Sequence, residues 1–278
     1  MRSVIETGFP LKGIALAAYA LLTVSCGKLV FENRAECPAV LYLKAVNARD
    51  IPVDSPVYIE AFTPDHKVVL AQETADISSF VDGSAAVKVG VSQNVVVCGA
   101  AGADKDVVRA GTQWMALTGE NWPALWRFSS NVPAFIDTSV ENIRFKKEYM
   151  EVTVHLVNGW EEPDLPVHDY ELTVTSSTAG IDLRTGLPVK GDFQYRPRMK
   201  NASFTFRVPR QKDRTLQFVI KPFDEYGRRY DDRAVRVVLW GALQNVHGFT
   251  WEVEDLPDLR VEYDCLNGSV GTFVDWIY

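Results

Sequence analysis

The chain has 278 residues, of which 47% are apolar and 23% charged, a composition typical of soluble globular proteins and unlike that of disordered chains or multi-span membrane proteins. Its 29 basic and 36 acidic residues give a net charge of -7, which repels phosphate backbones and excludes nucleic acid as an expected partner. The length allows two domains of ordinary size, and the recurrence of Val, Thr and aromatic residues after the first 25 positions favours an all-β fold.

The N-terminal segment has the features of a secretory signal. Basic residues precede an unbroken apolar run over residues 14–24, which is too short to span a bilayer as a helix of the mature protein. The sequence Leu22–Cys26 resembles a bacterial lipobox. We predict that residues 1–25 are removed, that Cys26 becomes the acylated N-terminus, and that residues 26–36 form a tether. A buried helix with Cys26 as a core thiol is disfavoured, because an uncapped apolar stretch at the extreme N-terminus rarely packs that way.

Residues 37–147 are predicted to form a first β-sandwich. Short apolar or alternating segments, each bounded by Gly, Pro, Asp or Asn, indicate strands joined by turns, at residues 39–46, 57–62, 67–71, 86–91 and 95–99. A longer irregular stretch begins at Gly99 and holds Trp114, Trp122 and Trp126. We expect this stretch to wrap over one edge or face of the sheet.

Residues 148–278 are predicted to form a second β-sandwich. Met150, Val152, Val154 and Leu156 alternate with polar residues, which is the period-two pattern of a half-buried strand. The same alternation recurs at residues 172–174, 204–208, 216–220, 235–239 and 259–263. Two antiparallel sandwiches of about seven strands each fit this spacing, with a boundary near residue 147.

The sequence carries no pattern typical of an active site. The four histidines lack the spacing of a metal site, and no nucleophile elbow or phosphate-binding glycine motif occurs, so we predict no enzymatic activity, no cofactor and no metal. His155 lies on the polar side of a predicted strand and is interpreted as an exposed sheet residue. With Cys26 assigned to lipid, Cys37, Cys98 and Cys265 allow at most one disulfide. A Cys37–Cys98 bridge and a buried free thiol both stay open.

Four short stretches carry a resemblance to a known family: Glu36–Pro38, Asn94–Ala100, Asp258–Asp264 and Val274–Ile277. Together with the lipobox and the two β-rich regions, they resemble the FimB/Mfa2 family of fimbrial anchor lipoproteins of Bacteroidetes. The resemblance implies two tandem transthyretin-like β-sandwiches, an outer-membrane lipid anchor at Cys26 and a place at the base of a fimbrium. Two features depart from the family pattern: Cys98 stands where an aromatic residue is usual, and the residues after Cys26 are not acidic.

Two functions follow as hypotheses. The first is a fimbrial anchor subunit that faces the cell exterior, binds shaft or accessory pilin subunits through strand complementation or a related sheet-edge contact, and limits fimbrial length. The alternative is a lipid-anchored glycan-binding or nutrient-capture envelope protein, in which Trp122 and Trp126 would expose two rings on a loop. The competing interpretation of these two tryptophans places them in the core, where a large β-sandwich uses such residues.

Overall fold

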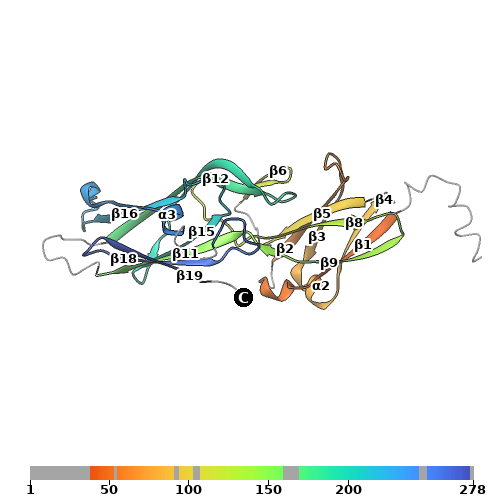
Figure 1. Cartoon of the computed structure of the whole chain (residues 1–278), viewed down its shortest axis with the longest axis horizontal. Coiled ribbons are helices and arrows are strands. Elements are labelled where there is room, and N and C mark those ends of the chain that lie inside the picture. Colours follow the sequence, from red (N-terminus) through yellow and green to blue (C-terminus); the bar gives the residue numbers. More distant parts are fainter. Residues whose placement is uncertain are drawn as a thin grey trace, which may run out of the picture.

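The computed structural model describes residues 38–52, 55–90, 94–102, 107–158, 169–243 and 249–275. The predicted signal peptide, the tether with Cys26, and Cys37 lie outside these ranges. The described chain is almost entirely β, which confirms the predicted fold class, and it forms an elongated body (Figure 1). No helix in these ranges is long and apolar enough to cross a membrane.

The first half of the body packs a three-stranded sheet, ordered β4-β1-β9, against a five-stranded sheet, ordered β10-β8-β5-β2-β3. Strand β1 pairs antiparallel with β4 and parallel with β9. Alternate side chains of both sheets meet in one apolar core, which the short helix α2 closes with Ile77 and Phe80. The elements are β1 (Pro38–Ala45), η2 (Ala48–Asp50), β2 (Pro56–Phe62), β3 (Val69–Asp76), α2 (Ile77–Asp82), β4 (Ala85–Gly90), β5 (Asn94–Ala101), β8 (Trp126–Pro133), β9 (Thr138–Ile143) and β10 (Lys146–Lys147).

The second half packs a sheet ordered β14-β15-β11-β18-β19 against one ordered β17-β16-β12-β7-β6, with β13 paired to β12. The alternation predicted for β11 is confirmed, because Met150, Val152, Val154 and Leu156 are all buried in the second core. The elements are β6 (Val107–Ala110), β7 (Gln113–Ala116), β11 (Tyr149–Val157), β12 (Asp169–Asp182), β13 (Pro188–Tyr195), β14 (Met199–Lys200), β15 (Ser203–Pro209), β16 (Gln217–Phe223), η3 (Asp231–Arg233), β17 (Val235–Val238), α3 (Leu239–Leu243), β18 (Asp258–Asp264) and β19 (Ser269–Asp275).

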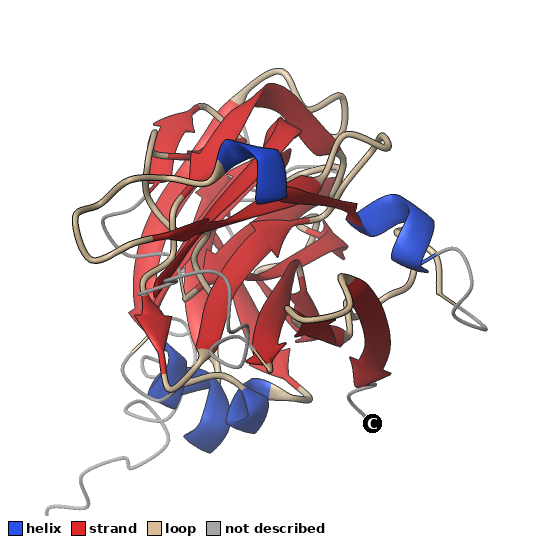
Figure 2. Ribbon diagram, turned by 90° about the vertical axis from the view of Figure 1, so that its left-hand side faces the viewer, coloured by secondary structure: helices blue, strands red, loops and turns tan. Residues whose placement is uncertain are grey.

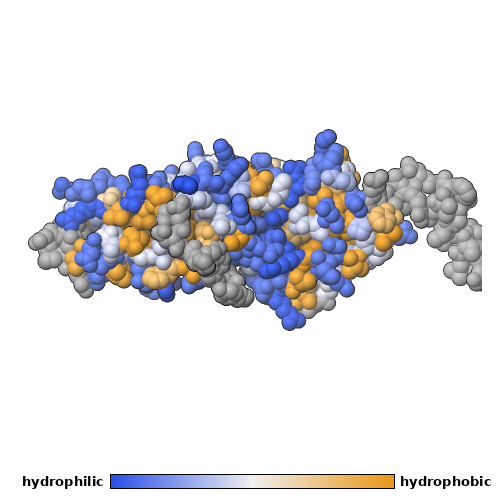
Figure 3. Space-filling model, viewed as in Figure 1, coloured by the Kyte–Doolittle hydropathy of each residue, from blue (hydrophilic) through white to orange (hydrophobic). Residues whose placement is uncertain are grey.

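Figure 2 views the body along its length from the end that carries β16, so that the strands of the two halves lie behind one another. The surface in Figure 3 is mainly hydrophilic, with apolar residues scattered over both halves.

The β6–β7 hairpin departs from the predicted division of the chain. Its residues fall within the range 37–147 that was expected to form the first sandwich, yet β7 pairs with β12 of the second half, where Met115 lies opposite Gly180. The hairpin also lies over the first half. Trp114 meets the ring of Tyr58 edge to face at 5.6 Å, and the Arg109 guanidinium lies 3.6 Å from the centre of the Tyr58 ring. The irregular stretch therefore covers a sheet face, and it does so as part of the other half's sheet.

Strand β5 is consequently buried on both faces. Val95 and Val97 point into the first core, whereas Val96, Cys98 and Ala100 belong to the second core. This double burial explains why the strand is a continuous apolar run rather than an alternating one. A division near residue 147 into separately folding units stays a prediction.

Candidate functional site

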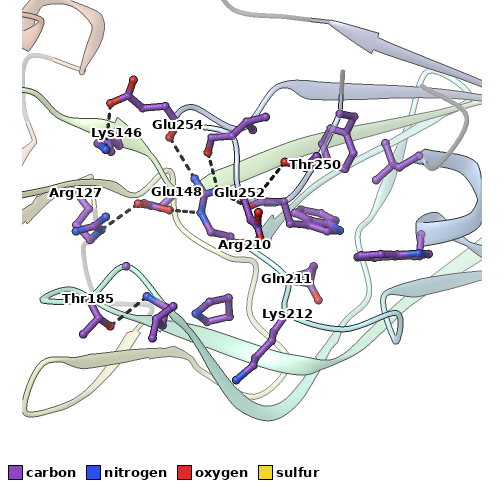
Figure 4. A pocket seen from close by; sticks show the side chains of 18 residues that line it. Arg127, Lys146, Glu148, Thr185, Arg210, Gln211, Lys212, Thr250, Glu252 and Glu254 are labelled. Atoms are coloured by element: carbon purple, nitrogen blue, oxygen red, sulfur yellow. Dashed lines mark hydrogen bonds and ion pairs between the residues drawn. The ribbon is translucent and has the colours of Figure 1, made fainter. Parts of the chain in front are cut away.

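A buried ionic network joins the two halves of the body. Glu148 lies between β10 and β11, and its carboxylate is 1% exposed. Arg127, on β8 of the first half, donates from Nε to Glu148 Oε1 at 3.0 Å. Arg210, which follows β15 in the second half, donates from Nε to Glu148 Oε2 at 2.7 Å. One carboxylate thus accepts charge-assisted hydrogen bonds from both halves (Figure 4).

Backbone carbonyls accept further hydrogen bonds from both arginines. Arg127 Nη1 donates to the Leu183 carbonyl at 3.1 Å. Arg210 Nη1 donates to the carbonyls of Trp251 and Val253, the latter at 2.8 Å, and its Nη2 donates to a third carbonyl in the same segment. Since buried guanidinium groups are costly unless every donor has a partner, this arrangement is stable only with the segment 251–254 in place.

A pocket of about 650 Å³ opens beside this network. Its apolar wall includes Trp240 of α3 together with Phe249 and Trp251, whose rings meet edge to face at 5.2 Å. Lys146 and Lys212 contribute cationic side chains to its lining (Figure 4). The volume is that of a small-molecule site, and aromatic faces with a few polar groups suit a sugar or an aromatic side chain.

A second ionic contact lies at the junction, by which we mean the region around residues 147–148 where the two halves meet. Lys147 is buried, and its Nζ donates to Asp258 Oδ1 at 2.5 Å, while the same carboxylate oxygen accepts the Glu151 backbone N–H at 2.9 Å. Burial lowers the pKa of the Lys147 ammonium, and the bond to Asp258 opposes that shift. Strand β18 is thereby fixed against the chain segment that connects the two halves.

The structure excludes the loop surface suggested for the glycan-binding alternative. Trp122 has no exposed surface and Trp126 is 7% exposed. Trp122 belongs to the second core and Trp126 to the first, where it meets Tyr149 edge to face. The interpretation of both residues as core tryptophans is confirmed, and they present no platform for a sugar.

Cys98 and His155, which the sequence also singled out, lie within the β-sheets and not in a ligand site. Cys98 is a free thiol without exposed surface, and burial raises its pKa to about 12. Cys37, its suggested partner, lies outside the described residues. His155 Nδ1 lies 2.8 Å from Ser203 Oγ on the neighbouring strand, as expected for a residue on the polar side of a sheet. Within the described residues, no group of three or more His, Cys, Asp or Glu side chains could hold a metal ion.

Within the part of the chain that the structure describes, two long strands pair on one side only and so form open sheet edges. Strand β19 is the last strand of its sheet and pairs with β18 over seven residues without a register shift. The turn that joins β18 to β19 is well defined, because Gly268 has φ +66° and the Asp264 carboxylate accepts hydrogen bonds from two backbone N–H groups. Strand β19 contains neither Pro nor Lys, the residues that commonly protect an edge. Strand β3 ends the first five-stranded sheet, but its pairing with β2 is interrupted by a register shift.

The sequence did not point to the network or the pocket. Arg127, Glu148 and Arg210 are separated by 21 and 62 positions along the chain, and each resembles an ordinary surface charge in isolation. The sequence did not distinguish Trp240, Phe249 and Trp251 from the other aromatic residues, and only the fold shows that Trp240 and Phe249 are partly exposed while Trp251 is buried.

Comparisons with known proteins bear on the fold alone. No family model and no curated protein sequence matches this chain. Among solved structures, it is similar to the fimbrial anchor protein Mfa2 of Porphyromonas gingivalis, at 13% identity and a TM-score of 0.58 over 87% of this chain and 100% of the other. The resemblance to that family seen in the sequence is confirmed at the level of the fold.

Two structures from Bacteroides thetaiotaomicron are comparably similar. A candidate polysaccharide binding protein matches at 16% identity and a TM-score of 0.59, over 86% of this chain and 98% of its own. A candidate adhesin matches at 12% identity and a TM-score of 0.59, over 86% and 97% of the respective chains.

Proposed function

We propose that this chain is a fimbrial anchor subunit. In this proposal residues 1–25 are a signal peptide, Cys26 carries the lipid, and residues 26–36 tether the body to the outer membrane on the cell exterior. The observation that carries the proposal is the fold shared with Mfa2 over most of the chain. The lipobox supports it independently.

The proposed partner is a fimbrial shaft or accessory pilin subunit that adds a strand to β19. An open edge offers unpaired backbone N–H and C=O groups to an incoming strand, and the neighbouring side chains supply specificity. Val270 and Phe273 of β19 are 38% and 43% exposed, so they can contact side chains of the added strand. The regular pairing of β18 with β19 supports this edge over that of β3, where the ladder is interrupted.

Acylation and anchoring are tested in the native cell. We expect metabolic labelling with palmitate to mark the wild-type protein and not the Cys26→Ser variant. Cys26→Ser and deletion of the gene should each release fimbriae into the medium while polymerisation continues, because the acyl chains that resist extraction, at about 0.8 kcal/mol per methylene, are gone. Unlabelled wild-type protein, or fimbriae that stay on the deletion strain without a second anchor gene, would refute the proposal.

The strand edge is tested with a matched pair of substitutions. Val270→Lys places an edge charge on β19, and Leu70→Lys places one on β3, where the native side chain is 37% exposed, nearly the same as Val270. We expect Val270→Lys to weaken binding of the purified pilin and Leu70→Lys to leave it unchanged. The reverse outcome would assign the contact to β3 and reject β19.

A second candidate function is the binding of a glycan in the pocket beside Trp240, Phe249 and Trp251. The aromatic lining favours it, and one structure of the same fold belongs to a candidate polysaccharide binding protein. A glycan array with the wild-type protein and Trp240→Ala tests this function. Tight binding that depends on Trp240 would support it. Trp126→Phe is the control, because Trp126 is buried and does not line the pocket.

A further inference from the structure

Two neighbouring apolar side chains project from one end of the body. Phe135 and Ile136 lie between β8 and β9 and are 57% and 48% exposed. Ala134, just before them, is completely buried, so the loop is fixed to the first core at its base. Single exposed apolar residues are common on soluble proteins, but adjacent large ones at a loop tip indicate a contact with something apolar.

The chain enters the fold at the same end. Pro38 begins β1, and the parallel pairing of β1 with β9 sets Val40 opposite Thr138. The Val40 N–H donates to the Asp137 carbonyl at 2.9 Å, directly after the two apolar residues. Figure 1 shows that this end of β1 and β9 is remote from β16. The loop tip is therefore the part of the described body next to the proposed tether.

Beyond the exposed polar residues Asp137 and Thr138, further exposed apolar side chains lie on the three-stranded sheet. On the outer face of that sheet Val140 is 58% and Tyr42 is 37% exposed, and the two are paired in register. Lys44 and Lys88 lie on the same outer face. No residue that β1, β4 or β9 contributes to this face is acidic. Lys88 lies opposite Val40 and so close to the tip, whereas Lys44 lies near the far end of β1. An apolar tip with a nearby tyrosine and lysine has the composition of a surface that meets a lipid headgroup region.

We propose that Phe135 and Ile136 insert into the headgroup boundary of the bilayer to which the chain is tethered, an inference that rests on the proposed lipid anchor. Eleven residues, 27–37, separate Cys26 from Pro38 and reach at most about 40 Å when fully extended. Such a tether keeps the tip at a high local concentration beside the membrane. The tip can then bind the membrane even if its affinity is too weak to recruit an untethered protein, because the tether makes the binding intramolecular.

The test uses the mature chain with an N-terminal hexahistidine in place of the lipid, held on vesicles that contain a nickel-chelating lipid. The vesicles are prepared with and without bromine on the acyl chains, because bromine quenches tryptophan emission on contact. For each variant, the loss of emission on brominated vesicles is compared with the loss measured for the wild type. Phe135→Trp probes the tip. Tyr226→Trp, at an 86% exposed site beyond β16, is the matched control at the remote end.

We expect brominated lipid to quench Phe135→Trp several-fold more than Tyr226→Trp, whose quenching should equal that of the wild type. Equal quenching in the two variants, with both proteins shown on the vesicles by sedimentation, would overturn the inference. Equal quenching is also the result expected if the tip binds a protein partner and not lipid. Circular dichroism verifies that both variants are folded.

The two proposals fail in distinguishable ways. The chelating tether does not depend on acylation, so Phe135→Trp reports membrane contact whether or not the cell modifies Cys26. Palmitate labelling without quenching rejects the loop contact and keeps the anchor. Quenching without palmitate labelling rejects the lipid anchor and keeps the affinity of the tip for lipid.

Discussion

Removing the charge of Glu148 is predicted to destabilise the protein strongly. The carboxylate is 1% exposed and pairs with two arginines that are each 10% exposed, so Glu148→Gln leaves two buried guanidinium groups without their counter-charge. Breaking a buried ion pair from one side typically costs about 3–5 kcal/mol. With a urea dependence of about 2–3 kcal/mol per molar, the unfolding midpoint should fall by about 1–2.5 M.

A matched control lies three residues further along the chain. Glu151 pairs with Arg207 at 3.0 Å, the same distance that separates Glu148 from Arg127, but the side chains of both Glu151 and Arg207 are 36% exposed. Glu151→Gln should cost no more than about 1 kcal/mol, or roughly 0.5 M in midpoint. Urea unfolding of the mature chain, followed by tryptophan emission and far-ultraviolet circular dichroism, compares the two variants. Equal midpoints would refute the assignment of Glu148 as the charge on which the junction depends.

Three further outcomes are expected. Cys98 should resist Ellman's reagent at pH 8 in the folded protein and react in urea, because burial raises its pKa to about 12 and disfavours the thiolate; rapid native labelling, mapped by mass spectrometry, would contradict this. Gly99→Ala should cost about 1–3 kcal/mol in thermal or urea unfolding, since its Cβ would lie 2.5 Å from both the Phe128 ring and the Tyr58 carbonyl oxygen; an unchanged midpoint would contradict this close approach. Fragments separated after Lys147 should each unfold cooperatively, both at lower urea than the intact chain, because the cut separates β7 from β12 and Arg127 from Glu148; aggregation of both would reject two separately folding units.

Local patterns predicted the strands because alternation and turns act over a few residues. Strand β11 is buried at every second position, as its sequence indicates. The apolar run of β5 identified a strand but could not show what covers its second face. That cover is the β6–β7 hairpin, which pairs with β12 about seventy positions further along the chain, as in Ile181 opposite Trp114.

The junction could not be predicted for a different reason. Arg127 lies on a strand and Arg210 directly after one, and charged residues at such positions usually face water. Only the packing of the two halves brings them to Glu148 and removes water from all three. The two tryptophans of the 122–126 segment illustrate the opposite case, since their residue type suggested a ligand surface and packing buried them.

The position of β1 in its sheet has a mechanical consequence. This strand is the first that the chain forms after the proposed tether, and it lies between β4 and β9 with ladders on both sides. Sheet hydrogen bonds run across the strand direction, so a pull on Pro38 along the strand loads them in shear and all at once, instead of opening them one after another. If the chain anchors a fimbrium as proposed, a pull by flow would load β1 through its ladders with both β4 and β9, and the lifetime of the attachment would depend on the rate at which β1 separates from them.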